Sequence, residues 1–206
     1  VVPEATSEAG GVSMPHAVLH GGTGNCLFIL EGACDRRSWR WRVPYCEVWP
    51  VYHAAYEAGT GAIYAAAASE WHGAGVWRSP DLGETWELSS EGLGYGENSE
   101  LKFSKVSGLS AMHGRVRAGG EGCGVFESRD GARTWSLLST LDDQPGRDAW
   151  NIPSNQPPGH LGMPGLLADP DEPGRFWTVS QGFGIFETAD NGGSWTGGHR
   201  GQTAGW

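Results

Sequence analysis

The sequence is poor in charge and contains no long apolar run. Charged residues make up only 18% of the 206, and the 14 Lys and Arg, outnumbered by 24 Asp and Glu, form no cluster. A basic cluster is the usual footprint of nucleic-acid binding, so we expect no nucleic-acid partner. No apolar run nears the ~20 residues of a membrane-spanning helix, so we expect no membrane span. The first ten residues lack the basic and apolar regions of a signal peptide, which favours a cytoplasmic location and leaves the compartment otherwise open.

Cysteine is scarce, and its spacing does not indicate a metal site. The four cysteines, at positions 26, 34, 46 and 123, form no Cys-x-x-Cys pair. Zinc sites usually need such a pair or a paired histidine, so we expect no metal and no cofactor. The cysteines are expected as small buried side chains. A disulfide such as Cys34–Cys46 is the alternative.

Glycine and tryptophan, by contrast, are abundant. The chain has 34 Gly, 12 Pro and 11 Trp, and the glycines recur in register with the tryptophans. This pattern is typical of many short strands joined by tight turns, with large aromatic side chains packed between layers.

An internal repeat organises the chain. Three segments align without a gap, and each reads Gly-x-Gly, aliphatic, aromatic, x, Ser/Thr, x, Asp, three residues, Ser/Thr, Trp. A period near 50 with several short strands fits a propeller blade, whereas glycines this frequent would break the helices of a solenoid. The copies are Gly73–Trp86, Gly122–Trp135 and Gly182–Trp195, with a degraded fourth at Cys26–Trp39.

Each copy predicts a turn built on its aspartate. Asp81 can accept hydrogen bonds from the N–H groups of the turn, and Gly83 supplies a positive φ. In the second copy Ala132 replaces this glycine and Gly131 precedes it, so we expect a distorted turn there. We expect the tryptophan of each copy to be largely buried. The aspartate, the hydroxyl residue and the tryptophan of each copy are assigned structural roles. These residues are Asp81, Thr85, Trp86, Asp130, Thr134, Trp135, Asp190, Ser194 and Trp195.

These turns carry a resemblance. The segments 79–86 and 188–195 match the Asp box, S/T-x-D-x-G-x-T/S-W, of sialidases and BNR-repeat proteins. With the stretches 49–54 and 65–71, the chain resembles bacterial WD40/YVTN/BNR-like proteins of the exo-α-sialidase/sortilin-like superfamily, often labelled glycosyl hydrolases. The resemblance implies a β-propeller whose Asp boxes are structural turns on the rim, away from the ligand face.

We therefore predict an all-β fold, a β-propeller of four-stranded antiparallel blades in one domain spanning 1–206. A partial blade covers 1–46, and three full blades cover approximately 47–100, 101–160 and 161–206. In the first full blade the expected strands are Val51–Tyr56, Ala62–Ala68, Val76–Ser79 and Thr85–Leu88. We expect a fragment of a six- or seven-bladed propeller; a closed four-bladed ring is the alternative.

Antiparallel blades place the remaining loops at the end opposite the aspartate turns, where propellers usually hold ligands. Glu70, Trp71 and His72 combine a carboxylate, an aromatic platform and an imidazole in one such loop, which suits a carbohydrate; the alternative is a plug between blades. Glu121 and Gln181 occupy the equivalent loops. Tyr52 and His53 lie on a strand lining the channel, where the alternative is a hydrogen-bonded interior histidine.

Two functions from different classes follow. The first is a non-catalytic binding or scaffold module for a glycan or a protein partner, or for further propeller blades. The second is an exo-α-sialidase-like hydrolase whose remaining catalytic residues lie outside this chain. The stretch Trp41-Arg42-Val43-Pro44 is similar to the sialidase motif Phe/Tyr-Arg-Ile-Pro, which implies that Arg42 grips a substrate carboxylate. Sialidases also need a Tyr nucleophile, acids and two more arginines, which we do not find; the first function is therefore favoured.

Overall fold

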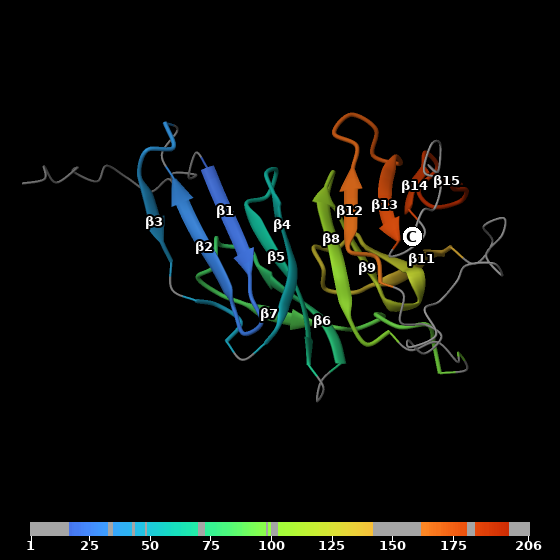
Figure 1. Cartoon of the computed structure of the whole chain (residues 1–206), viewed down its shortest axis with the longest axis horizontal. Coiled ribbons are helices and arrows are strands. Elements are labelled where there is room, and N and C mark those ends of the chain that lie inside the picture. The colour runs from blue at the N-terminus through green and yellow to red at the C-terminus, as the bar shows by residue number, and fades with distance from the viewer. Residues whose placement is uncertain are drawn as a thin grey trace, which may run out of the picture.

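The computed structural model describes residues 17–32, 35–42, 44–47, 49–69, 73–97, 99, 103–141, 162–180 and 184–197. These residues form four antiparallel sheets that follow one another along the chain (Figure 1). Regular structure here is β throughout, apart from one short 3-10 turn. The prediction of an all-β propeller is confirmed.

Each sheet is a simple up-and-down meander, which we call blades one to four in chain order. Blade one has three strands in the described chain, and blades two to four have four each. Blade one consists of β1 (Ala17–Gly22), β2 (Leu27–Gly32) and β3 (Trp39–Trp41). Blade two consists of β4 (Val51–Glu57), β5 (Ala62–Ser69), β6 (Gly73–Ser79) and β7 (Glu87–Ser89). Blade three consists of β8 (Val106–Met112), β9 (Arg115–Gly120), the 3-10 turn η1 (Glu121–Cys123), β10 (Gly124–Ser128) and β11 (Ser136–Thr140). Blade four consists of β12 (Gly165–Ala168), β13 (Phe176–Ser180), β14 (Gly184–Thr188) and β15 (Thr196–Gly197).

The first strands of the three full blades lie side by side. In Figure 1, β4, β8 and β12 follow one another across the centre of the molecule. These strands form the inner row, and β7, β11 and β15 are the outer edges of their sheets. In blade one, β1 is the counterpart of the second strands, and it contacts β4. The arrangement is that of propeller blades set around an axis.

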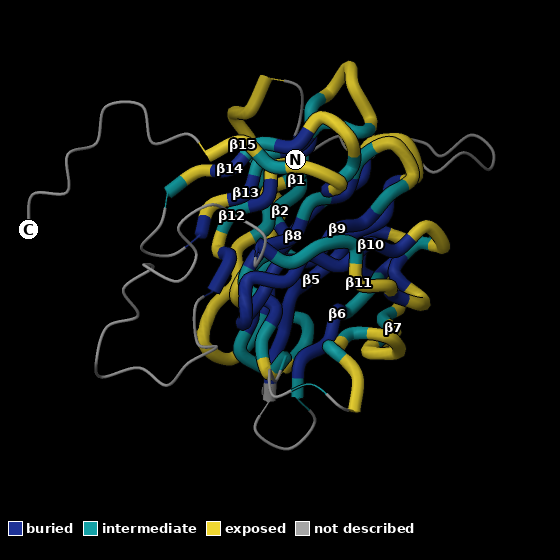
Figure 2. Tube along the Cα trace, turned by 90° about the vertical axis from the view of Figure 1, so that its right-hand side faces the viewer, coloured by how far each residue is buried: buried dark blue, intermediate teal, exposed yellow. Residues whose placement is uncertain are grey.

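The hydrophobic core is divided among the three interfaces between blades. One cluster joins blades one and two around Leu27, Ile29 and Ile63. A second joins blades two and three around Tyr64, Val76 and Phe126, and a third joins blades three and four. The burial is deepest along β5, β9 and β10, where the tube in Figure 2 is dark blue. Each blade is thus stabilised mainly by its neighbours.

The three aspartates make the same turn in each full blade. We call residues 79–86, 128–135 and 188–195 the aspartate turns. In the first, Asp81 accepts hydrogen bonds from the backbone N–H of Thr85 (2.8 Å) and the hydroxyl groups of Thr85 (2.6 Å) and Ser79 (2.9 Å). Ser79 Oγ in turn accepts the N–H of Gly83 at 2.7 Å. The turn therefore satisfies its own polar groups, as the sequence predicts for structural aspartates.

The expected distortion of the second turn is wrong. Asp130 keeps the same bonds to Thr134 and Ser128, and Ser128 Oγ accepts the N–H of Ala132 at 2.8 Å. Ala132 has a φ of 64° and Gly131 one of 72°, so two successive residues are left-handed here, as Leu82 and Gly83 are in the first turn. A positive φ is sterically unfavourable for alanine. The methyl group of Ala132 is nevertheless fully buried and packs in the interface with blade two.

The tryptophans of the turns pack between blades. Trp86 lies 5.5 Å from the ring of Tyr45, in the cluster that joins blade two to blade one. Trp195 donates its indole N–H to Ser139 of blade three at 2.9 Å. Burial is uneven: Trp135 is 6% exposed, whereas Trp86 and Trp195 are only half-buried. All three rings pack against the core between blades, and Trp135 is the most completely buried of them.

An ion network, which the sequence did not reveal, joins blades three and four. Arg117 is 1% exposed and lies 3.2 Å from the buried carboxylate of Glu127. Its guanidinium also donates to Asn191, in the aspartate turn of blade four, at 2.7 Å. The group stacks 4.4 Å from the ring of Phe176. Burial of this charge is offset by the carboxylate of blade three and by acceptors from blade four.

Candidate functional site

The candidate site lies at the end of the blades opposite the aspartate turns, where β4 and β8 begin. Two hydrogen bonds identify this end. The N–H of Val51, at the start of β4, donates to the carbonyl of Thr23 in the β1–β2 turn at 2.9 Å. The N–H of Glu121, after β9, donates to the carbonyl of Lys105, just before β8, at 3.3 Å. The starts of the inner strands and the connections between the second and third strands therefore meet here, as the sequence predicts for a ligand face.

Tyr52 is presented by a β-bulge. The pairing of β4 with β5 shifts between Val51 and His53, which leaves Tyr52 as the extra residue. A bulge turns a side chain out of its usual alternation, and the Tyr52 side chain is 47% exposed. Lys105 Nζ lies 4.9 Å from the centroid of the ring, within range of a cation–π contact. An aromatic ring and an ammonium group thus stand together at the inner edge of two blades.

The same bulge recurs in the next blade. The pairing of β8 with β9 shifts between Val106 and Gly108, which makes Ser107 the counterpart of Tyr52. Gly108 packs so tightly that a Cβ there would come within 2.6 Å of the carbonyl of Met163 in blade four. Two consecutive inner strands therefore carry a bulge at the same end of the blades.

Two histidines lie beside this end on neighbouring strands. Burial lowers the pKa of His53, and burial together with the nearby His53 lowers the pKa of His20. Both imidazoles are therefore favoured in the neutral form, which can both donate and accept hydrogen bonds. Nδ1 of His53 is buried and has no hydrogen-bond partner among the described residues. This differs from the interior histidine with satisfied nitrogens that was the sequence alternative.

Glu121 lies at this end, but its carboxylate and its backbone carbonyl accept hydrogen bonds that stabilise the local turn. Its side chain accepts a hydrogen bond from the Ser104 hydroxyl, and its carbonyl accepts one from the Tyr95 hydroxyl. Tyr95 also accepts the N–H of Gly124 at 2.9 Å. Gly122, with a φ of 76°, completes the turn. Glu121 is 9% exposed, so it supports the site from beneath.

The other predicted loop residues cannot be placed. Glu70, Trp71, His72 and Gln181 lie outside the described residues. Their contribution to the site remains a prediction.

Arg42 is far from this group, beside an aspartate turn. Its guanidinium pairs with Glu31 of β2 at 2.9 Å and also with Glu84, in the aspartate turn of blade two. Hydrogen bonds to Glu84 and to Glu31 raise the pKa of Arg42. Arg42 therefore joins blade one to blade two through these two ion pairs. It does not lie with Tyr52 and His53. Its predicted role as a carboxylate ligand remains untested.

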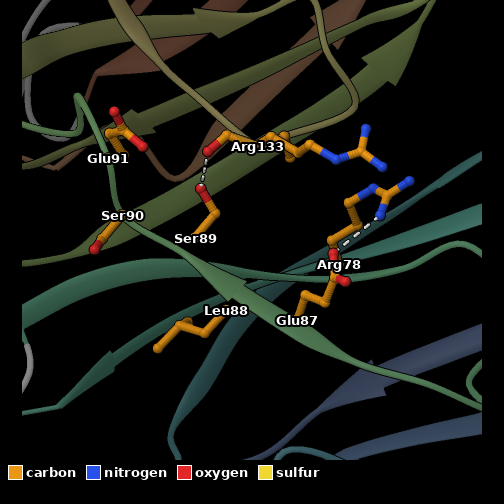
Figure 3. A pocket seen from close by; sticks show the side chains of 8 residues that line it. Arg78, Glu87, Leu88, Ser89, Ser90, Glu91 and Arg133 are labelled. Atoms are coloured by element: carbon orange, nitrogen blue, oxygen red, sulfur yellow. Dashed lines mark hydrogen bonds and ion pairs between the residues drawn. The ribbon is translucent and has the colours of Figure 1, made fainter.

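A hollow of about 480 Å³ lies elsewhere, between β7 and the aspartate turn of blade three (Figure 3). Arg78 pairs with Glu87 across it at 3.3 Å, and the Ser89 hydroxyl donates to the carbonyl of Arg133 at 2.6 Å. The second contact joins the outer edge of blade two to blade three, whereas the first lies within blade two. No pattern in the sequence predicts this hollow, because its walls come from two blades.

The described residues contain no group of three or more His, Cys, Asp or Glu placed to hold a metal ion. Within the same residues, no helix is long and apolar enough to cross a membrane.

Comparison with known proteins finds likeness in fold only. No family model matches the sequence, and no curated protein does. Among solved structures, the GH74 xyloglucanase from Xanthomonas campestris superposes with a TM-score of 0.58 at 15% identity, over 90% of this chain and 29% of its own. YCF48 from Cyanidioschyzon merolae gives 0.54 at 13% identity, over 90% of this chain and 53% of its own. The chain thus spans at most about half the length of these two proteins.

Proposed function

We propose that this chain is a non-catalytic propeller module that binds a glycan at the end of the blades where β4 and β8 begin. One observation carries the proposal: the bulge in β4 presents the ring of Tyr52 at 47% exposure beside Lys105 and His53. Sugars bind to proteins by stacking a ring face on an aromatic side chain while polar groups bond to their hydroxyls. The ammonium group of Lys105 is suited to the second role.

The assignment to the Asp-box, or BNR-repeat, proteins is part of the same proposal. Its support is the geometry of the three aspartate turns, which repeat one set of hydrogen bonds in three blades. In this assignment Glu70, Trp71, His72 and Gln181 extend the site around Tyr52. The expected completion of a six- or seven-bladed ring also belongs here.

A glycoside hydrolase is the second candidate, because the xyloglucanase shares the fold. Hydrolysis of a glycosidic bond normally requires two carboxyl groups on either side of that bond. Glu121, the acid that the sequence places at this end, is buried in its turn, so it is poorly placed to act on a bound sugar. We therefore favour binding without catalysis. Sialidase activity, if present, would require Arg42 and residues beyond this chain.

The test is binding of the whole chain to a glycan array, compared with the variants Tyr52→Ala and Lys105→Ala. The matched control is Leu137→Ala on β11, which removes a side chain of similar exposure, 44%, from the outer edge of blade three. We expect at least a tenfold loss of affinity in the first two variants and none in the control. Unchanged binding in both folded site variants would refute the site. Cleavage of a fluorogenic sialoside that Arg42→Ala abolishes would instead restore the hydrolase.

A further inference from the structure

At the contact between blades one and two, one guanidinium group joins two carboxylates. Glu31 lies on β2, and Glu84 lies in the aspartate turn of blade two. Arg42, which follows β3, pairs with both: its Nη2 atom lies 2.9 Å from Glu31, and its Nη1 atom contacts Glu84. A charged side chain of opposite sign therefore occupies the space between two like charges from neighbouring blades.

The contact between blades two and three carries charges of the opposite sign at the same positions. Alignment of the repeat copies places Arg78 where blade one has Glu31, and Arg133 where blade two has Glu84. Arg78 lies against the turn of blade three, because a Cβ built on Gly131 would lie 3.4 Å from its Nε atom. Two guanidinium groups thus take the places of two carboxylates.

The residue at the bridging position is small in this second contact. The repeat and the strand pairing place Ser89 where blade one has Arg42. The Ser89 hydroxyl donates to the carbonyl of Arg133 at 2.6 Å, and it is too short to join two guanidinium groups. The hollow of about 480 Å³ lies here, and Arg78, Ser89 and Arg133 line it. In Figure 3 the side chains of Arg78 and Arg133 extend to the same side of the hollow.

Two acids also line the hollow, and neither bridges the two arginines. Glu87 pairs with Arg78 at 3.3 Å, but its side chain is 68% exposed. A pair this exposed contributes little stability, so a competing anion can displace Glu87 readily. The Glu91 side chain lies at the other end of the hollow from both guanidinium groups in Figure 3. The pair with Glu87 nevertheless shows that Arg78 accepts a carboxylate from this side.

We propose that the hollow binds a small organic acid whose carboxylate is held by Arg78 and Arg133. A guanidinium group binds a carboxylate through two parallel N–H···O bonds, and the two oxygens offer enough lone pairs for a second guanidinium group. The two ion pairs of Arg42 show the same chemistry with the signs exchanged. The hollow is larger than a carboxylate group, and Leu88 and Ala132 contribute to its walls, so the ligand carries a carbon skeleton.

This site is separate from the proposed glycan site. The hollow adjoins the aspartate turn of blade three, whereas Tyr52 lies at the opposite end of the blades. Loss of binding at one site therefore leaves the other testable.

The experiment is calorimetric titration of the whole chain with glucuronate and with glutarate, a sugar acid and a short aliphatic acid. Glucose and glutaramide are the neutral counterparts. We expect an acid to bind and its neutral counterpart not to bind, and the tighter acid identifies the kind of skeleton that the hollow takes. Arg133→Gln and Arg78→Gln should each weaken the tighter acid at least tenfold in Kd.

The matched control is Arg37→Gln. Arg37 has the place of Arg133 in the repeat copy of blade one and is exposed, so its loss should leave binding unchanged. Arg133 is also exposed, so Arg133→Gln should fold as the native chain does, which circular dichroism checks. Failure of both acids to bind, or binding that Arg133→Gln leaves unchanged, would overturn the proposal. Equally tight binding of inorganic sulfate or phosphate would overturn the assignment to a carboxylate.

A substitution that supplies the carboxylate from within the chain is a sharper test. Ser89→Glu places an acid at the position that Arg42 has in blade one. We expect this variant to lose binding of the added acid and to unfold at a higher urea concentration than the native chain. Ser89→Gln has the same size without the charge and should not raise the urea midpoint. Equal midpoints for the two Ser89 variants would show that the two arginines do not hold a carboxylate.

Discussion

Glu57 at the end of β4 accepts a hydrogen bond of 2.9 Å from the backbone N–H of Gly114, in the β8–β9 turn of the next blade. The same carboxylate accepts the hydroxyl groups of Thr60 at 2.8 Å and Tyr64 at 3.4 Å. One blade further, a ring nitrogen of His113 lies 2.8 Å from the carbonyl of Asp169. The inner turns of three consecutive blades are thus joined by polar contacts at the end carrying the aspartate turns.

Glu57→Gln should destabilise the chain by about 1–3 kcal/mol, because an amide presents one acceptor oxygen where the carboxylate presents two. Glu57 is 6% exposed, so water cannot readily replace the lost partner. The measurement is urea unfolding followed by tryptophan fluorescence. Glu172→Gln, at an exposed acid in the turn before β13, should change stability by less than half as much. Equal effects of the two substitutions would mean that the contact between the turns contributes nothing.

Trp135→Ala should cost roughly 3–5 kcal/mol, because the ring is 6% exposed and fills the interface between blades two and three. Trp86→Ala and Trp195→Ala should cost less, because both rings are half-buried. Urea unfolding of the three variants gives the ranking directly. A cost at Trp86 as large as that at Trp135 would contradict the link between burial and stability in these turns.

The sequence predicted the repeat and the strands well, because each is encoded locally. The strands expected at Val51–Tyr56 and Ala62–Ala68 differ from β4 and β5 by one residue each. The aspartate turns followed from the spacing of Asp, a hydroxyl residue and Trp. Each needs only eight consecutive residues to form.

Contacts between blades could not be predicted in the same way. The network of Arg117, Glu127 and Asn191 joins two blades. No local sequence pattern specifies how those two blades are aligned with each other. Arg42 belongs to the same class, because its carboxylate partners lie 11 residues before it and 42 after it. The bulge at Tyr52 was also missed, since it arises from pairing with β5 and has no sequence signature of its own.

The stability of the chain should fall as the pH drops from about 4 to about 2, and Asp190 should account for part of that fall. Hydrogen bonds from the Ser194 hydroxyl and N–H lower the pKa of Asp190 to about 2. An unfolded aspartate titrates near pH 3.9, so the folded state binds fewer protons within this window. A depressed folded pKa stabilises above the unfolded pKa, and that contribution is lost as protons bind.

Urea unfolding at several pH values between 5 and 2 tests this prediction. Asp190→Asn should be less stable than the native chain near pH 5, and the difference should shrink towards pH 2. Asp171→Asn, which removes the same charge from an exposed position, is the control and should leave the pH dependence unchanged. A constant difference between Asp190→Asn and the native chain across this range would show that the carboxylate form is not the stabilising one.

Cys46 should be unreactive in the folded protein. Burial, and secondarily the nearby Cys26, raises the pKa of the Cys46 thiol to about 12. The thiolate is the species that alkylating agents attack, and an unperturbed cysteine titrates near pH 8.5. At pH 8 the folded protein should therefore hold roughly a thousand times less Cys46 thiolate than the unfolded chain, or less still. Mass spectrometry after timed iodoacetamide labelling, in buffer and in urea, gives the rate of labelling for each cysteine.

Reduction of the protein beforehand excludes a disulfide with Cys34 as the cause of protection. Equal rates of Cys46 labelling in the folded and unfolded states would place this thiol at the surface, and the packing of Cys46 against the cluster of blades one and two would then be wrong.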